Sequence, residues 1–170
     1  MKSILSKSLF LNSLVLFIVF CLSACGFHLR GKADIPFDTI YIIGNTLVIS
    51  KQLNNTFALN EVEILDSADN ADLQLDLLGE ENEKRILSIG ADGTVNEFEL
   101  YYRVHYRSRL AGQPLWGEVQ TVEARRDFTF SESNRLAKGE EERQLNKNMY
   151  EDVVGSIVRR LSATARQSQR

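Results

Sequence analysis

The chain has 170 residues, of which 44% are hydrophobic and 25% charged, and its formal net charge is −3. The 20 basic and 23 acidic residues leave no basic excess of the kind that nucleic-acid-binding proteins carry. Both cysteines, Cys21 and Cys25, lie close to the N-terminus, which excludes a disulfide framework in the rest of the chain.

Residues 1–24 are predicted to form a cleaved signal peptide. The first residues include Lys2 and Lys7, which make the start of the chain positive. An apolar run follows that is shorter than the roughly 20 residues of a membrane-spanning helix. The run ends in Leu22-Ser23-Ala24-Cys25, which resembles the bacterial lipobox, where a lipid is attached to the cysteine sulfur and the chain is cut before it. The alternative is an ordinary signal peptide that leaves Cys25 as a free thiol.

Lipidation would anchor residues 25–170 to a membrane as a single domain of 146 residues with net charge −5. Each buried methylene contributes about 0.8 kcal/mol, so two or three acyl chains hold a protein stably. The covalent lipid on Cys25 is the only cofactor expected. Gly26 stands where an Asp resembles the inner-membrane retention signal of many Gram-negative lipoproteins, and we therefore expect the outer membrane.

In chain order, the first predicted strand is the β-branched run 39–43. Apolar residues every four positions then predict a short amphipathic helix over 50–58, with Ser50 as its N-cap. Residues 62–65 are expected to form a short extended piece. Three strands are expected next, over 73–89, 94–110 and 116–130, with a hairpin turn at 90–93 between the first two.

The C-terminal part is predicted to begin with a polar loop over 135–144 and to continue as a long helix from Leu145, with one apolar face. The fold class is therefore α+β, with a small mixed four-stranded sheet, two helices packed on one face and the order β-α-β-β-β-α. The first two strands pair in parallel across the first helix, and both hairpins are antiparallel.

No catalytic or metal-binding constellation is evident in the sequence. His28 and His105 are far apart, and the chain has no HExxH, GxSxG or phosphate-loop motif. Carboxylates occur in charge-mixed runs typical of a solvated surface. The sequence therefore predicts neither an enzyme nor a metal site.

A basic stripe is the most suggestive feature. Arg103, His105, Arg107 and Arg109 alternate along one predicted strand, about 6–7 Å apart, since alternate residues are two strand rises apart. Such a row can bind phosphates or other anions. The alternative is an exposed face that uses charge to prevent edge-to-edge pairing.

Four short motifs indicate a family. They are Cys25-Gly26-Phe27-His28-Leu29-Arg30, Asp92-Gly93 with Glu97-Phe98, Leu136-Ala137-Lys138, and Met149-Tyr150. Together with the lipobox and the element order, they resemble LptE, the family of lipopolysaccharide-assembly lipoproteins. The resemblance implies a partner of the outer-membrane β-barrel protein LptD, which plugs the barrel lumen, assists barrel assembly and binds lipopolysaccharide.

The resemblance also implies where lipopolysaccharide binds, since the family's basic residues lie at the central hairpin and before the last helix. Lys138 matches the second place, whereas Ala91 stands at the first. Lys84 and Arg85 could supply the missing charge, and Arg103 and Arg107 of the basic stripe could share the task.

Two other classes of function compete with this interpretation. One is a structural envelope lipoprotein that anchors the cell wall or another periplasmic machine to the outer membrane. The other is a lipoprotein hydrolase, for which no candidate site is apparent in the sequence.

Overall fold

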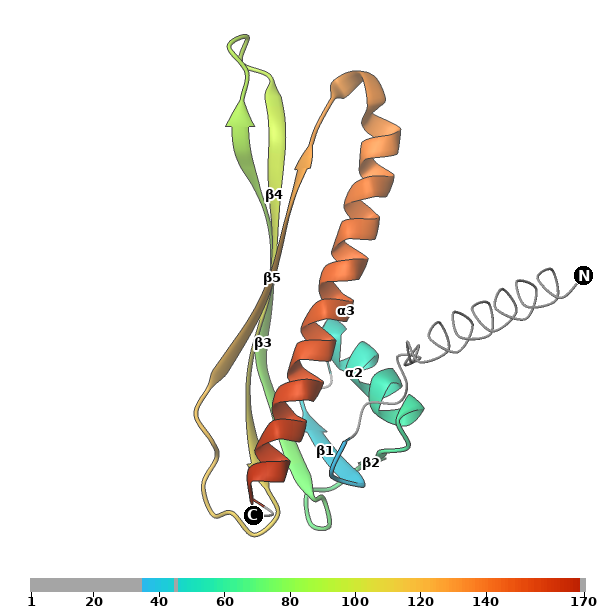
Figure 1. Cartoon of the computed structure of the whole chain (residues 1–170), viewed down its shortest axis with the longest axis vertical. Coiled ribbons are helices and arrows are strands. Elements are labelled where there is room, and N and C mark those ends of the chain that lie inside the picture. Colours follow the sequence, from blue (N-terminus) through green and yellow to red (C-terminus); the bar gives the residue numbers. More distant parts are fainter. Residues whose placement is uncertain (1–34, 45, 169–170) are drawn as a thin grey trace, which may run out of the picture. The chain divides into compact units, whose positions relative to one another are not determined.

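The structure is a computed structural model, and it describes residues 35–44 and 46–168 (Figure 1). The predicted signal peptide, Cys25 and Gly26 lie outside the described residues, so they remain predictions. The described elements are β1 (Thr39–Ile43), α2 (Val48–Leu59), β2 (Glu63–Leu65), β3 (Leu73–Ile89), β4 (Val95–Leu110), β5 (Gln120–Thr129), the 3-10 turn η1 (Glu132–Asn134) and α3 (Arg135–Ser168).

The sheet has five strands in the order β2-β1-β3-β4-β5. β1 pairs in parallel with β3, and β3, β4 and β5 form an antiparallel meander, as the sequence predicts. The predicted count of four strands is wrong because the piece after α2 is itself a strand, β2, which pairs with β1 in parallel. Three residues are too few to show the alternation by which a strand is recognised.

The start of α2 differs from the prediction. The helix begins at Val48, and Leu47, not Ser50, occupies the N-cap position. Ser50 is buried in the first turn, and its hydroxyl donates to the Leu47 carbonyl oxygen over 2.6 Å. The Glu80 carboxylate caps the helix instead, accepting from the N–H groups of Val48 (2.6 Å) and Ile49 (3.2 Å).

The predicted loop over 135–144 is also wrong, because α3 runs without a break for 34 residues. Its first turns are polar and mostly exposed, but Glu, Lys and Arg are good helix formers. Ion pairs one turn apart, Lys138–Glu141 and Arg143–Glu140, support this part. The helix therefore extends for about 51 Å, at 1.5 Å per residue.

One face of the sheet carries the core. Alternate residues of β1, β3, β4 and β5 form a single buried cluster with the apolar sides of both helices, so both helices pack on that face. Leu53 and Phe57 of α2 and Ile157 of α3 are all inaccessible to solvent. No helix of the described chain covers the opposite face, which we call the outer face (Figure 1).

The described chain has two halves that differ in how many elements surround β3. β1 pairs with β3 only from Leu73 to Asp76. We call residues 35–44, 46–78, 105–121 and 151–168 the lower body, which holds β1, α2 and β2. Residues 79–104 and 122–150 form the upper arm, where β3, β4 and β5 continue beside the first half of α3 (Figure 1).

Candidate functional site

The structure divides the predicted basic residues between the two faces of the sheet. Lys84 of β3 lies opposite Leu100 of β4 and so points to the face of α3, where Lys138 also lies. Arg103 and Arg107 of β4 alternate with core residues and point to the outer face, and Arg85 of β3, which lies opposite Glu99, points to the same face. The five residues do not form one cluster.

Lys84 lies over the aromatic end of the core. Its Nζ is 4.2 Å from the centre of the Phe98 ring and 5.5 Å from that of Phe128. The same nitrogen donates to Glu142 of α3 over 2.6 Å. The ammonium group thus connects the hairpin with α3, and its side chain is about one-third exposed.

Lys138 lies in the first turn of α3, near the end of β5. Its Nζ donates to Thr129 Oγ1 over 3.0 Å and to Glu141 over 2.7 Å. Lys84 and Lys138 are therefore both held by carboxylates of α3, and those carboxylates, Glu141 and Glu142, are adjacent in sequence. An incoming anion would compete with these two glutamates for the two lysines.

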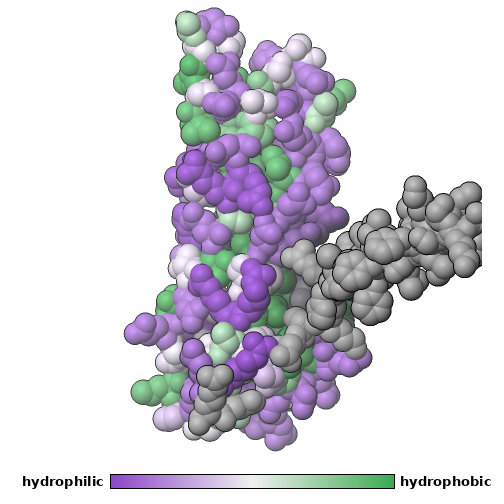
Figure 2. Space-filling model, in the orientation of Figure 1, coloured by the Kyte–Doolittle hydropathy of each residue, from purple (hydrophilic) through white to green (hydrophobic). Residues whose placement is uncertain are grey.

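Exposed apolar side chains surround this end of the upper arm. Ile86, Leu87 and Ile89 of β3 are 54%, 43% and 61% exposed, and Leu136 of α3 is 94% exposed. Figure 2 shows hydrophobic side chains among hydrophilic ones near this end of the described chain. Ammonium groups beside exposed aliphatic side chains suit a ligand that is both anionic and apolar.

The turn between β3 and β4 carries an acid and no base. Ala91 is exposed there, and Asp92 accepts from the N–H (3.1 Å) and the hydroxyl (2.7 Å) of Thr94. These hydrogen bonds lower the pKa of Asp92. Gly93 has φ +82°, a conformation that favours glycine, so the Asp-Gly motif specifies the turn's geometry.

The basic stripe is neutralised by carboxylates on neighbouring strands. Arg103 binds Glu123 of β5 and Glu81 of β3, which raises the pKa of Arg103 above its usual value. Hydrogen bonds from Arg103 and His105 lower the pKa of Glu81. The alternative interpretation of the basic stripe is that its charges prevent edge-to-edge pairing of a strand. It is wrong because β4 lies inside the sheet and has no free edge.

The remaining outer-face arginines also have acidic or aromatic partners. Arg107 donates to Asp76, which is only 8% exposed, and Arg107 and Arg109 both lie against the Trp116 ring. Arg85 contacts Glu83 and the Tyr101 ring. Carboxylates outnumber guanidinium groups on this face: Asp76, Glu81, Glu83, Glu97, Glu99, Glu123 and Asp127 against Arg85, Arg103, Arg107, Arg109 and Arg125. The outer face is therefore a polar, charge-paired surface and not a basic patch.

Glu80 is a structural residue that the sequence does not reveal. Besides capping α2, its carboxylate accepts from the Tyr102 hydroxyl over 2.7 Å. Burial and this hydrogen bond raise the pKa of Tyr102 well above its usual value. The Tyr102 ring meets the Tyr150 ring edge-on, and Tyr150 accepts from Asn82 over 2.7 Å. This network joins α2, β3, β4 and α3 where the lower body meets the upper arm.

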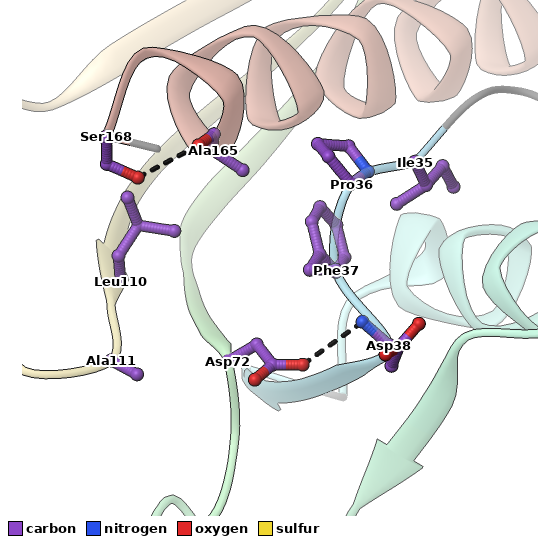
Figure 3. A pocket seen from close by; sticks show the side chains of 9 residues that line it. All are labelled: Ile35, Pro36, Phe37, Asp38, Asp72, Leu110, Ala111, Ala165 and Ser168. Carbon is purple, nitrogen blue, oxygen red and sulfur yellow. Dashed lines mark hydrogen bonds between the residues drawn. The ribbon is translucent and has the colours of Figure 1, made fainter. Parts of the chain in front are cut away.

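A pocket of about 460 Å³ lies in the lower body, between the chain before β1 and the C-terminal turn of α3 (Figure 3). Its wall includes Pro36, Phe37 and Leu110, and the Asp72 carboxylate there accepts from the Asp38 N–H over 3.1 Å. None of the predicted basic residues lines it. We therefore place the candidate site at the tip of the upper arm.

Among residues 35–44 and 46–168, no group of three or more His, Cys, Asp or Glu side chains could hold a metal ion. Within the same ranges, no helix has the length and apolar character needed to cross a membrane.

Solved structures share this fold. Uncharacterized lipoprotein B from Nitrosomonas europaea is 33% identical, with a TM-score of 0.71 over 82% of this chain and 92% of that chain. The rare lipoprotein B from Shewanella oneidensis is 25% identical, with a TM-score of 0.69 over 78% of this chain and 99% of that one. The fold is thus that of a class of envelope lipoproteins.

Sequence comparison gives the family. The family model described as "LptE: Lipopolysaccharide-assembly" matches residues 37–161. The LPS-assembly lipoprotein LptE of Pectobacterium atrosepticum is 26% identical over 157 residues, which cover 89% of this chain and 84% of that protein. LptE of Yersinia pestis is 25% identical over 144 residues, covering 82% and 69%. The chain belongs to the LptE family, whose members are non-enzymatic lipopolysaccharide-assembly lipoproteins.

Proposed function

We propose that this chain is an outer-membrane lipoprotein that binds lipopolysaccharide at the tip of its upper arm and plugs an LptD-like β-barrel, whose assembly it assists. The observation that carries the proposal is the combination of Lys84 and Lys138 with exposed aliphatic side chains at one end of the molecule. Membership of the LptE family supports the same function.

Lipopolysaccharide has the chemistry that this end would recognise, since it joins phosphate groups to acyl chains. Ammonium groups bind phosphate oxygens through charge-assisted hydrogen bonds. The ligand's phosphates would take Lys84 and Lys138 from Glu142 and Glu141, and its acyl chains would cover Leu136. In this proposal Lys84 supplies the charge that Ala91 lacks.

The outer face suits the lumen of a barrel. The interior of a large transmembrane barrel is polar, and its apolar outer band is about 25 Å tall. β3, with 17 residues, extends for about 56 Å, so the domain is long enough to pass through that band. Charges that are already paired across β3, β4 and β5 can contact a polar wall without leaving a buried charge unpaired.

The partner is tested by affinity purification of the tagged, lipidated protein from its own outer membrane. We expect one large β-barrel protein to co-elute at a ratio of about one to one, as a plug requires. Recovery of peptidoglycan or another envelope machine, without a barrel, would favour a structural anchor and contradict the proposal.

The ligand is tested by the charge reversals Lys84→Asp and Lys138→Asp, with Lys51→Asp on α2 as the matched control. Since a hydrogen bond to a charged group contributes about 1.5–3 kcal/mol, we expect each reversal at the tip to weaken lipopolysaccharide binding at least roughly tenfold. The control should bind like the parent. Unchanged binding in both tip variants would reject the assignment of these residues.

A further inference from the structure

The edge of β3 changes character along the strand. β1 covers it from Leu73 to Asp76, and the Glu80 carboxylate then reaches the first turn of α2. From Glu81 to Ile89 β3 pairs with β4 alone, and no other strand of the described chain lies beside it. An unpaired row of backbone N–H and C=O groups is a template for another strand.

The opposite edge of the upper arm is β5, and α3 contacts it. Lys138 of α3 donates to Thr129 Oγ1 of β5 over 3.0 Å. Asp152 of α3 binds Arg126 of β5. The two edges of the same three-stranded arm therefore differ. From Glu81 to Ile89, α3 contacts β3 through the side chains of Asn82 and Lys84, and no strand of the described chain pairs with that edge.

The open edge has a charged part and an apolar part. Residues 81–85 carry both signs of charge, which is a usual means of discouraging strand addition. Here, however, Glu81 pairs with Arg103, Glu83 with Arg85 and Lys84 with Glu142, so these charges oppose an added strand less than unpaired charges would. Ile86, Leu87 and Ile89 have no such protection, although all three are among the exposed large hydrophobic residues. A register shift between Ile86 and Ser88 places Leu87 outside the regular pairing with β4.

We propose that the open edge of β3, residues 81–89, docks an extended polypeptide segment of the β-barrel partner, which adds a strand to the sheet. The inference rests on the proposed function, which supplies that partner. Backbone hydrogen bonds along residues 81–86 would provide the pairing, and Ile86, Leu87 and Ile89 would contact apolar side chains of the added strand. A polypeptide is the ligand that matches backbone groups in a row, whereas acyl chains would satisfy only the side chains.

The test is amide hydrogen exchange of the lipidated protein, alone and in the purified complex with its barrel. We expect exchange across residues 81–86 to slow at least roughly tenfold in the complex, since new hydrogen bonds protect amides. Residues 120–129 of β5 serve as the internal control and should change less. A complex in which residues 81–86 exchange as fast as in the free protein would overturn the docking edge while leaving the plug function intact.

Paired variants separate a strand from a lipid surface. Leu87→Lys and Ile89→Lys should reduce the co-purified barrel at least roughly threefold, because charge at an edge opposes strand addition. Val119→Lys, in an exposed loop, is the matched control and should not. Protection of residues 81–86 by lipopolysaccharide vesicles but not by the barrel would overturn the proposal in favour of a lipid ligand. Failure to recover any barrel would overturn both this inference and the plug function.

Discussion

Strand β3 runs through both the lower body and the upper arm, but it is buried only in the lower body. All five residues of β3 from Leu73 to Leu77 are buried, and none from Leu78 to Ile89 is. β4 does not change in this way, since Leu100 and Tyr102 in the arm are as inaccessible as Tyr106 in the body. The difference therefore arises from β1 and α2, which flank β3 in the body and are missing from the arm.

This comparison indicates a division of labour between the halves. The body has five strands and two helices around a continuous core, so most of the stability should come from it. The arm has three strands and half a helix, and it leaves aliphatic side chains exposed at its tip. Regions of low local stability are where ligands bind and partners dock. The following predictions test this division.

The largest effect is expected in the core of the body. Phe57 of α2 is inaccessible to solvent and packs against Phe37 at a centroid distance of 6.2 Å. Phe57→Ala should lower the free energy of unfolding by about 3–5 kcal/mol in urea denaturation. Leu59→Ala, two residues away and 77% exposed, should change it by less than about 0.5 kcal/mol. Equal losses would contradict the assignment of the core.

The joint between the halves should show the next largest effect. Glu80→Gln keeps the shape of the side chain but weakens its bonds to the α2 N-terminus and Tyr102. Because a charged acceptor is replaced by a neutral amide with only one acceptor oxygen, we expect the free energy of unfolding to fall by about 1–3 kcal/mol. Hydrogen exchange in α2 should rise more than in β5. Glu83→Gln, at an exposed surface pair, is the control and should have little effect.

A smaller, pH-dependent effect is expected from Asp72. Burial alone would raise the pKa of Asp72, but hydrogen bonds from Thr39 and Asp38 together lower it. A lowered pKa stabilises the fold above the unfolded value, near 3.8, and this contribution is lost as the pH falls through the folded value. When the pH falls below about 4, the free energy of unfolding of Asp72→Asn should therefore decrease less than that of the parent. Asp66→Asn, at an exposed turn, is the control variant for this measurement.

The smallest effect on stability is expected at the tip. Leu136→Ser removes a side chain that is 94% exposed, so the free energy of unfolding should change by less than about 0.5 kcal/mol. Binding of lipopolysaccharide should nevertheless weaken, because an apolar contact is lost. A large loss of stability without a change in binding would show that Leu136 supports the fold and does not contact the ligand.

Patterns within one element could be predicted from the sequence, whereas contacts between elements could not. The alternation along residues 98–106 gives β4 and its two faces, and the four-residue repeat from Met149 to Leu161 gives the buried side of α3. β2 is missed because it has three residues and depends on β1 for its pairing. The α2 cap is missed because Glu80 lies 32 positions from Val48.

The candidate site shows the same limit. The basic stripe is visible in the sequence, but its neutralisation by Glu81 and Glu123 depends on the register of three strands. Lys84 and Lys138 are predicted from the family resemblance, and the structure places both on the side of α3. Their neighbours Glu142 and Glu141 fall in a segment predicted as a loop, so the ion pairs could not be foreseen.

Photo-crosslinking at two exposed leucines tests the division of labour most directly. A photoreactive side chain is placed at Leu136 in the arm or at Leu59 in the body, and the lipidated protein is irradiated with lipopolysaccharide. If lipopolysaccharide binds at the tip of the upper arm, a lipopolysaccharide adduct forms at Leu136 and none forms at Leu59. Adducts of equal yield at both positions, or at Leu59 alone, would contradict a ligand site at the tip of the arm.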